Sequence, residues 1–371
     1  MSQHQRQRKV ALGHPRSALR RRYRAPRRYT PCTALELKLN LASPSARPVL
    51  SRRTFLIGSL LLAVSLAARA QQSKSARRIG VLAQELQPGL LETFRDQLRK
   101  LGYVEGTDVT IELRNAAGHN ERLATLVHDL LNLKVDVIVA INTPAAQAAK
   151  KATRTVPIVM MRVADPVKSG LVPSLAHPGG NVTGLSFMPD ALGPKGVELL
   201  REVLPKISQM AALYQGDNPG AVVIVNEVIR KGEQAGLKFV RLPVYGPNDY
   251  ASAFETASRA RSEALFVMDD GAITKHRREI LDLAAKHGLP VVSIYKDFAT
   301  SGGLIAYGPS LNEVYRRAAA YVDMLFKGEV ASGLPVEQPM AFDLVVNLKT
   351  AKALGISIPQ SVLLRADELI E

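Results

Sequence analysis

Short aliphatic runs alternate with longer amphipathic stretches along most of the chain, from residue 77 to residue 328. The first run, RIGVLA, predicts a buried strand, and the stretch LLETFRDQLRKLGY that follows predicts a helix. The apolar residues of that stretch recur at the spacing of one helical face: Leu90, Leu91, Phe94, Leu98 and Leu101. Strands separated by helices predict right-handed βαβ units and a parallel sheet.

A Gly/Pro-rich break at residues 176–189, AHPGGNVTGLSFMP, divides this alternation into two sets of about four βα units. The further strands predicted before the break are 108–115, 135–142 and 156–163, and the helices are 121–134 and 144–153. The strands predicted after it are 209–215, 237–244, 263–270 and 289–298, and the helices are 193–205, 218–236, 249–262, 274–288 and 311–328. Each set therefore predicts one doubly wound parallel sheet.

Two such sheets predict an α/β protein of two lobes, joined by three crossover links and enclosing a cleft. The first link follows the Gly/Pro-rich break, SGG at 301–303 returns the chain to the first lobe, and LPVEQPM at 334–340 leads back to the second. The lobes are expected to divide the chain as follows: 77–185 and 303–335 in the first, 186–302 and 336–371 in the second.

An uncharged run from Thr54 to Ala68 stands within the basic N-terminal part of the chain. As a helix it would span about 22 Å, short of the ~30 Å hydrocarbon core of a membrane. Two arginines precede it and the small-residue site ARA follows it, which is typical of an export signal cleaved after Ala70. SRRTFL also resembles the twin-arginine export motif, so residues 51–70 predict a periplasmic protein. A buried core helix and an uncleaved anchor are the alternatives.

Nearly all of the excess positive charge lies at or before this run. Residues 1–70 contain 15 Lys and Arg and one acidic residue, which accounts for +14 of the formal charge of +16. The remainder is close to neutral, so no nucleic-acid partner is expected. Residues 1–50 have no apolar periodicity and predict a disordered segment, or a true translation start near Val49 or Leu50. The only cysteine is Cys32, which excludes disulfides and Cys chemistry from residue 71 onward.

Five long segments of the body resemble the ABC-transporter substrate-binding family of the tryptophan/tyrosine type. They are LGYVEGTDVTIELR, LKVDVIVAINTPAAQAAKKATRTVPIVM, ADPVKSGLVPSLAHPGGNVTGLS, YGPSLNEVYRRAAAYVDMLFKG and LPVEQPMAFDLVVNLKTAKALGISIPQSVLLRADELIE. The resemblance covers about residues 77–371. It implies a type I periplasmic-binding-protein-like fold and a receptor, without a cofactor, that delivers a small solute to an ABC permease and its ATPase. Characterised relatives bind aromatic amino acids.

Ligands of doubly wound lobes bind at the carboxyl ends of the strands, so the residues near those ends are the candidate contacts. They are Gln84, Thr143, Pro144, Ala145, Asp165, Tyr214, Asn218, Asp269 and Tyr307. Thr143-Pro144-Ala145 opens a helix, whose free N–H groups could hold a carboxylate; alternatively, Thr143 only caps that helix. Asp165 could pair with an ammonium group, or accept hydrogen bonds in the turn at Pro166.

The neighbouring carboxylates Asp269 and Asp270 are not expected to face the same way. One could bind an ammonium or hydroxyl group, and the other could cap the helix near Thr274. Tyr307 could stack on a ligand or fix a hinge, whereas Phe187 could belong to the site or to the core. None of the histidines falls at a metal-ligand spacing.

These features favour a periplasmic receptor of an ABC importer, which captures an amino acid, including an aromatic one, by hinge closure. A ligand-sensing module and an enzyme on the same scaffold are the alternatives. The lack of thiols in the body disfavours a racemase-like enzyme. The export signal stands where a repressor would need its helix-turn-helix. We expect a monomer, because a face of each lobe is needed for docking to the permease.

Overall fold

The structure is a computed structural model that describes residues 76–187, 189–268 and 270–371, all within one compact unit, 73–371. The basic segment at 1–50, the export signal at 51–70 and Asp269 lie outside the described residues. Within the described residues, no helix is both long and apolar enough to cross a membrane.

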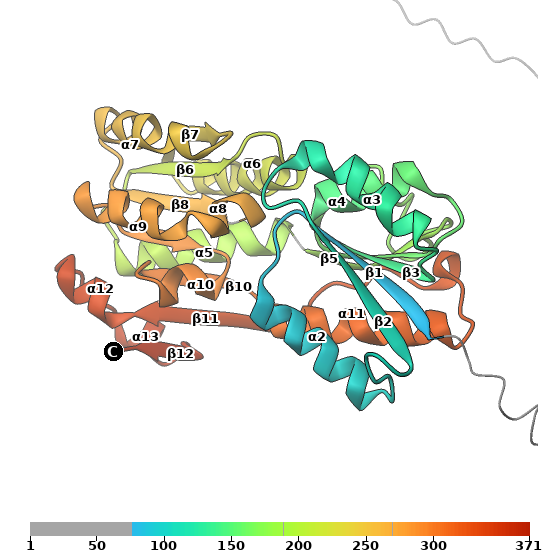
Figure 1. Cartoon of the computed structure of the whole chain (residues 1–371). Coiled ribbons are helices and arrows are strands. Elements are labelled where there is room, and N and C mark those ends of the chain that lie inside the picture. Colours follow the sequence, from blue (N-terminus) through green and yellow to red (C-terminus); the bar gives the residue numbers. More distant parts are fainter. Residues whose placement is uncertain (1–75, 188, 269) are drawn as a thin grey trace, which may run out of the picture. The chain divides into compact units, whose positions relative to one another are not determined.

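The first lobe contains a parallel sheet of five strands in the order β2-β1-β3-β4-β5 (Figure 1). Its strands are β1 (Arg77–Ala83), β2 (Val109–Asn115), β3 (Val137–Ile141), β4 (Ile158–Ala164) and β5 (Val182–Phe187). Its helices are α2 (Pro88–Lys100), α3 (Leu123–Asn132), α4 (Thr143–Ala152) and α11 (Leu311–Phe326), with a short 3-10 turn, η1 (Asn120–Arg122). Helices α2 and α11 pack together on one face, and α3 and α4 cover the other.

The second lobe contains a sheet of seven strands in the order β12-β11-β10-β9-β8-β6-β7. Its strands are β6 (Gln209–Gln215), β7 (Lys238–Val244), β8 (Ala264–Met268), β9 (Val291–Ser293), β10 (Ile305–Pro309), β11 (Phe342–Asn347) and β12 (Glu368–Ile370). Its helices are α5 (Pro189–Val203), α6 (Pro219–Gln234), α7 (Tyr250–Arg259), α8 (Gly271–Lys275), α9 (Arg277–Lys286), α10 (Lys296–Thr300), α12 (Leu348–Ala353) and α13 (Gln360–Leu363). A 3-10 turn, η2 (Pro247–Asp249), precedes α7. Another, η3 (Ala331–Gly333), follows α11 of the first lobe.

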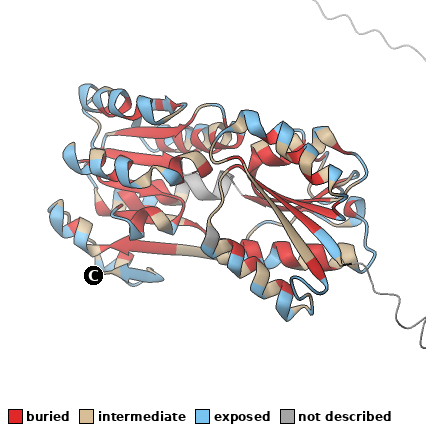
Figure 2. Cartoon of the chain, in the orientation of Figure 1, coloured by how far each residue is buried: buried red, intermediate tan, exposed pale blue. Residues whose placement is uncertain are grey.

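The central strands are buried on both sides because helices cover both faces of each sheet. Every residue of β3, β4 and β5 is buried, whereas the covering helices expose their outer faces (Figure 2). This explains why β3, VIVAI, is a continuous apolar run and why β4, IVMMRVA, is apolar except for Arg162.

The predicted class of two α/β lobes is confirmed, with two corrections of detail. Strand β11 pairs antiparallel with β10, so the second sheet is mixed and not purely parallel. The predicted strand 289–298 is divided, because β9 ends at Ser293 and α10 begins at Lys296.

The chain passes between the lobes three times within the described part. It leaves the first sheet after β5, and α11 returns to it from Ser310. The sequence analysis set that return at 301–303; because β10 pairs with β9 in the second sheet, the return lies beyond Pro309. The third crossing lies between Glu337, which still bridges to Leu185, and the start of β11. The other lobe boundaries stay a prediction.

The five parallel strands of the first sheet and the strands β6 to β10 of the second follow the same order. The strand order reverses between β1 and β3 in the first lobe, and between β6 and β8 in the second. In open α/β sheets ligands bind outside the carboxyl ends of the strands at such a reversal. The segments that follow these four strands are therefore where a site is expected.

Candidate functional site

Buried polar side chains gather at or near the carboxyl ends of the strands in both lobes. They are Gln84, Asn142, Thr143, Arg162 and Ser186 in the first lobe, and Gln215, Asn218, Asp270 and Ser293 in the second. Burial of a polar group costs free energy unless a hydrogen bond or a ligand compensates for it. We therefore take this edge of the two sheets as the candidate site.

Gln84 and Asn142 lie side by side at the reversal point of the first lobe. Asn142 Nδ2 donates a hydrogen bond of 3.1 Å to Gln84 Oε1. Gln84 is fully buried, and its Nε2 donor has no partner among the described residues. A buried amide donor without a partner is costly in a folded protein, so this group is available to an acceptor on a ligand.

The N-terminus of α4 adds further donors beside Gln84. Its N-cap residue, Asn142, has φ +77° and makes no side-chain capping bond. Thr143 is buried and lies against Gly220 of the second lobe, whereas Ala145 packs into the core of the first. Pro144, which has no N–H group, borders a groove between α3 and α4. An uncapped helix N-terminus favours an anion, as the sequence analysis expected of Thr143-Pro144-Ala145.

Arg162 is the buried cation of the first lobe, and the sequence analysis missed it. It lies where β4 bulges against β5, with φ +56° and a register shift between Met160 and Val163. Bulges re-aim side chains, and the guanidinium lies 4.5 Å from the centre of the Tyr295 ring in the second lobe. The signal in the sequence was a single arginine in the apolar run VPIVMMRV.

Asp270 is the buried carboxyl of the second lobe. Its Oδ1 accepts a hydrogen bond from the Ile273 N–H at 3.1 Å, and its Oδ2 accepts one from Asn218 Nδ2 at 2.9 Å. Burial raises its pKa, and the bonds from Asn218 and Ile273 and the charge of Arg162 oppose that rise. The guanidinium of Arg162 in the first lobe thus acts electrostatically on a buried carboxyl of the second lobe.

Asn218, a predicted ligand contact, has a structural role beside Asp270. Its Oδ1 accepts hydrogen bonds from the N–H groups of Gly220 and Ala221 at the start of α6. Its other amide atom donates to Asp270, so Asn218 orients that carboxyl. Asp270 itself makes the capping bond to Ile273 that the sequence analysis allowed for one of the two carboxylates. Asp269 lies outside the described residues.

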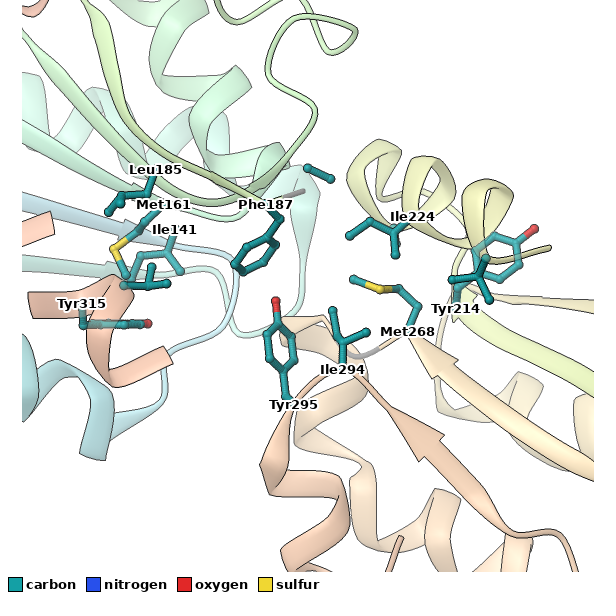
Figure 3. Packing of buried hydrophobic residues seen from close by; sticks show 14 of the residues in the cluster. Ile141, Met161, Leu185, Phe187, Tyr214, Ile224, Met268, Ile294, Tyr295 and Tyr315 are labelled. Atoms are coloured by element: carbon teal, nitrogen blue, oxygen red, sulfur yellow. The ribbon is translucent and has the colours of Figure 1, made fainter. Parts of the chain in front are cut away.

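Aromatic rings line the same region. Phe187, at the end of β5, faces Tyr295 of the second lobe, with ring centres 6.0 Å apart (Figure 3). Tyr315 of α11 is buried on the first-lobe side, and burial raises its pKa while Arg162 opposes the rise. Tyr295 and Tyr315 were not predicted, because only the fold brings a segment after β9 and a helix near the C-terminus to this place.

Three predicted contacts are engaged elsewhere. Asp165 accepts a hydrogen bond of 2.9 Å from the Lys168 N–H and lies 3.0 Å from Lys168 Nζ, as its turn alternative requires. Tyr214 packs in the core of the second lobe, away from the pair of Phe187 and Tyr295 (Figure 3). Tyr307 stacks on Phe342 of the neighbouring strand β11, with ring centres 5.8 Å apart. Their roles in binding stay predictions.

A cavity of about 300 Å³ lies where the two lobes meet. Gly118 and His119 line it from the first lobe, and Tyr245, Tyr250 and His276 from the second. Among the residues that the structure describes, no group of His, Cys, Asp and Glu could hold a metal ion. Of the buried polar residues named above, Gln215 alone lines this cavity. The candidate site itself offers a free amide donor, a buried guanidinium, a buried carboxyl and aromatic surface to a small polar molecule.

Comparison with known proteins identifies the family of this chain. Residues 81–370 match the model of the family described as ABC transporter substrate binding protein. A tyrosine-binding protein of Clostridioides difficile (strain R20291) is 26% identical over 288 residues, which cover 76% of this chain and 82% of that protein.

Two solved structures are similar over most of the chain. An ABC domain from Streptococcus pneumoniae in complex with L-Trp has a TM-score of 0.75 at 29% identity, covering 80% of this chain and all of that one. The ligand-free, open form of a substrate-binding protein with adhesive properties from Clostridium difficile has a TM-score of 0.60 at 26% identity, covering 80% and 99%. The chain belongs to the ABC transporter substrate-binding protein family.

Proposed function

We propose that the protein is the extracytoplasmic receptor of an ABC importer for an amino acid with an aromatic side chain. The observation that carries the proposal is a buried guanidinium and a buried carboxyl from different lobes, with the first lowering the pKa of the second, beside aromatic rings. A zwitterion with an aromatic ring complements these features. The tyrosine-binding relative and the L-Trp complex support the same class of ligand.

Each part of the ligand has a partner of suitable chemistry. Its carboxylate would be held by the first lobe, through Gln84 Nε2, the N-terminus of α4 and the guanidinium of Arg162. Its ammonium group would face Asp270 in the second lobe. Its ring would pack against Phe187 and Tyr295, which is favourable for aromatic pairs 4.5–7 Å apart.

Binding would close the lobes, because the ligand contacts come from both of them. The two solved relatives have similar identity to this chain, yet the L-Trp complex has the higher TM-score and the open form the lower one. This difference supports a closed arrangement here and a family in which the lobes move. The closed form would then be recognised by the permease.

The export signal at 51–70 belongs to this proposal. A receptor of an importer acts outside the cytoplasm, and residues 51–70 would direct it there by the twin-arginine route with cleavage after Ala70. N-terminal sequencing of the exported protein tests this, and a first residue other than Gln71 would contradict it.

The binding proposal is tested by thermal unfolding with L-Trp, L-Tyr and L-Phe. A ligand at a hundredfold excess over its Kd adds about 2.7 kcal/mol to the free energy of unfolding. At least one of the three should give such a saturable shift. Tryptamine, which lacks the carboxylate, and indole-3-propionate, which lacks the ammonium group, should each give a much smaller one.

Two outcomes would contradict the proposal. Equal shifts with tryptamine and L-Trp would show that the carboxylate donors of the first lobe do not bind the ligand. Consumption of the ligand during the measurement would indicate an enzyme instead of a receptor. Non-aromatic amino acids serve as the matched controls, because they carry the same charges without a ring.

A further inference from the structure

Two glycines of the second lobe lie against the first lobe at the edge of the candidate site. Gly220 is the second residue of α6 and Gly271 is the first residue of α8. Both helices begin next to the site, because Asn218 caps α6 and Asp270 caps α8. The backbone of the second lobe therefore approaches the first lobe beside the two residues that orient the buried carboxyl.

Neither glycine has room for a side chain in this arrangement. A Cβ on Gly220 would lie 2.4 Å from Thr143 Oγ1 and 3.1 Å from Thr143 Cβ. A Cβ on Gly271 would lie 2.5 Å from Glu85 Cβ and 2.9 Å from the Glu85 backbone N. Threonine is stiff about χ1 and a backbone nitrogen cannot rotate away, so neither contact is relieved by a small side-chain movement.

The close approach is the reason for glycine at these two positions. Neither residue lies in the left-handed region, where glycine would be needed for backbone conformation alone. The nearest atoms that a Cβ would meet belong to the other lobe in both cases; within its own lobe, a Cβ on Gly220 would lie 3.3 Å from Asn218 Oδ1. Nearby contacts between the lobes are looser: a Cβ on Gly118 would lie an ordinary 3.5 Å from Ala272 Cα, and Asn120 Nδ2 donates to Asp217 Oδ2 at 3.3 Å.

We infer that Gly220 and Gly271 are positioning residues that set how closely the two lobes approach around the ligand. Thr143 belongs to the N-terminus that would hold the carboxylate, and Glu85 follows the buried amide of Gln84. A methyl group at either glycine keeps the charges of the two lobes apart, so it weakens ligand binding without touching the ligand. This inference rests on the proposed function, because it assumes that a ligand is held by both lobes.

The test compares Gly220→Ala and Gly271→Ala with the unchanged protein, using an aromatic amino acid that stabilises the latter. Each variant should bind at least about tenfold more weakly, with the change mostly in the dissociation rate. Melting temperature without ligand should stay within about 2 °C, because each lobe keeps its own core. Gly196→Ala in α5 is the matched control, since a Cβ there would meet no described atom within 4 Å.

A second measurement reports the approach of the lobes without relying on affinity. The chain has one cysteine, so Cys32→Ser permits spin labels at Lys151→Cys in α4 and Glu233→Cys in α6, both exposed. The distance between the labels should be longer in the two glycine variants than in the protein with glycine at both positions, at saturating ligand.

The outcomes separate this inference from the proposed function. Unchanged affinity and unchanged label distances in both variants would overturn the inference while leaving amino-acid binding in place. If no amino acid binds the parent protein, the proposed function fails. The label distances measured without ligand then decide the steric inference alone, and equal distributions overturn it.

Discussion

At the scale of single residues, the site depends on a carboxyl that is kept from water. Asp270 is buried and accepts two hydrogen bonds, yet burial outweighs them and its pKa is raised above the usual aspartate value. A raised pKa means that the charged form becomes dominant only at a higher pH than for an exposed aspartate. A ligand ammonium group would favour that charged form and lower the pKa again.

The pH dependence of ligand binding should therefore report Asp270. Affinity should fall as the pH is lowered through the raised pKa of this carboxyl, because protonation removes the partner of the ammonium group. Because the folded-state pKa is raised, the contribution of Asp270 to the free energy of unfolding is fully present below its unfolded-state pKa of about 3.9. This contribution is lost as the pH rises through the folded-state pKa.

Asp270→Asn should weaken amino-acid binding about thirtyfold or more at neutral pH, since removal of one buried charge partner costs roughly 2–5 kcal/mol. Isothermal titration calorimetry between pH 4.5 and 8 should also show a flatter pH profile for the variant. Asp96→Asn is the control, because Asp96 is exposed and its ion pair with Arg99 lies within α2. Equal affinity and an unchanged profile in Asp270→Asn would refute the role of this carboxyl.

At the scale of elements, one irregularity in the first sheet places the buried cation. Strand β4 shifts register against β5 between Met160 and Val163, and Arg162 has a positive φ within the shift. Gly184 on β5 makes the shift possible, because a Cβ there would lie 2.1 Å from the Met160 carbonyl oxygen. With φ +126°, this position also excludes other residues on backbone grounds.

Gly184→Ala should destabilise the protein by at least about 2 kcal/mol, from backbone strain and overpacking together. Urea unfolding measures this loss, and ligand affinity should fall too, because the displaced bulge moves Arg162. Gly180→Ala, just before β5, has open space for its Cβ and should be neutral. A stable Gly184→Ala variant with full affinity would contradict the importance of the bulge.

At the scale of the whole described body, the third crossing is fixed to the first lobe before it enters the second. The backbone of Glu337 exchanges hydrogen bonds with Gly184 and Ser186, both 2.9 Å. Its carboxylate accepts two bonds from Arg317 of α11, at 2.6 and 2.5 Å, and the bond from Arg317 lowers the pKa of Glu337. The Ala341 carbonyl accepts a hydrogen bond of 3.1 Å from the Ser310 N–H, so the part of this link between the two fixed points is residues 338–340.

Glu337→Gln should lower the free energy of unfolding at pH 7 by about 0.2–1 kcal/mol, a small value because both side chains are more than a third exposed. Since the folded pKa is lowered, the contribution is present above the unfolded pKa of about 4.3 and is lost as the pH falls through the folded pKa. Urea unfolding at pH 7 and pH 3 checks both statements.

The control for this prediction is Glu313→Gln. Its ion pair with Arg316 lies within α11 and joins no other element. If the free energy of unfolding of Glu337→Gln still differs from that of the unchanged protein at pH 3, the electrostatic explanation is contradicted.

The sequence by itself determined the order of strands and helices. A strand that is buried on both faces needs a mainly apolar run, whereas a helix that is buried on one face needs an apolar stripe. It therefore predicted two lobes and named Gln84 and Thr143 by their place after a strand. It gave no warning that β11 runs antiparallel, since strand direction depends on which edge a returning segment meets. It also set the second crossing too early, because the Gly-rich SGG is typical of a link and the strand Ile305–Pro309 after it was not predicted.

Only the tertiary structure decided which residues face one another across the site. Arg162 reaches Tyr295 through a bulge, and Tyr315 arrives on a helix that is 153 residues away from Arg162 in the sequence. The hydrogen bonds of Asp270 to Asn218 and Ile273 identified this carboxyl as a buried residue of the site. The pattern of apolar and polar residues reflects the burial and periodicity of one helix or strand at a time. Contacts between lobes depend on long-range packing, so they are fixed only when both sheets are in place.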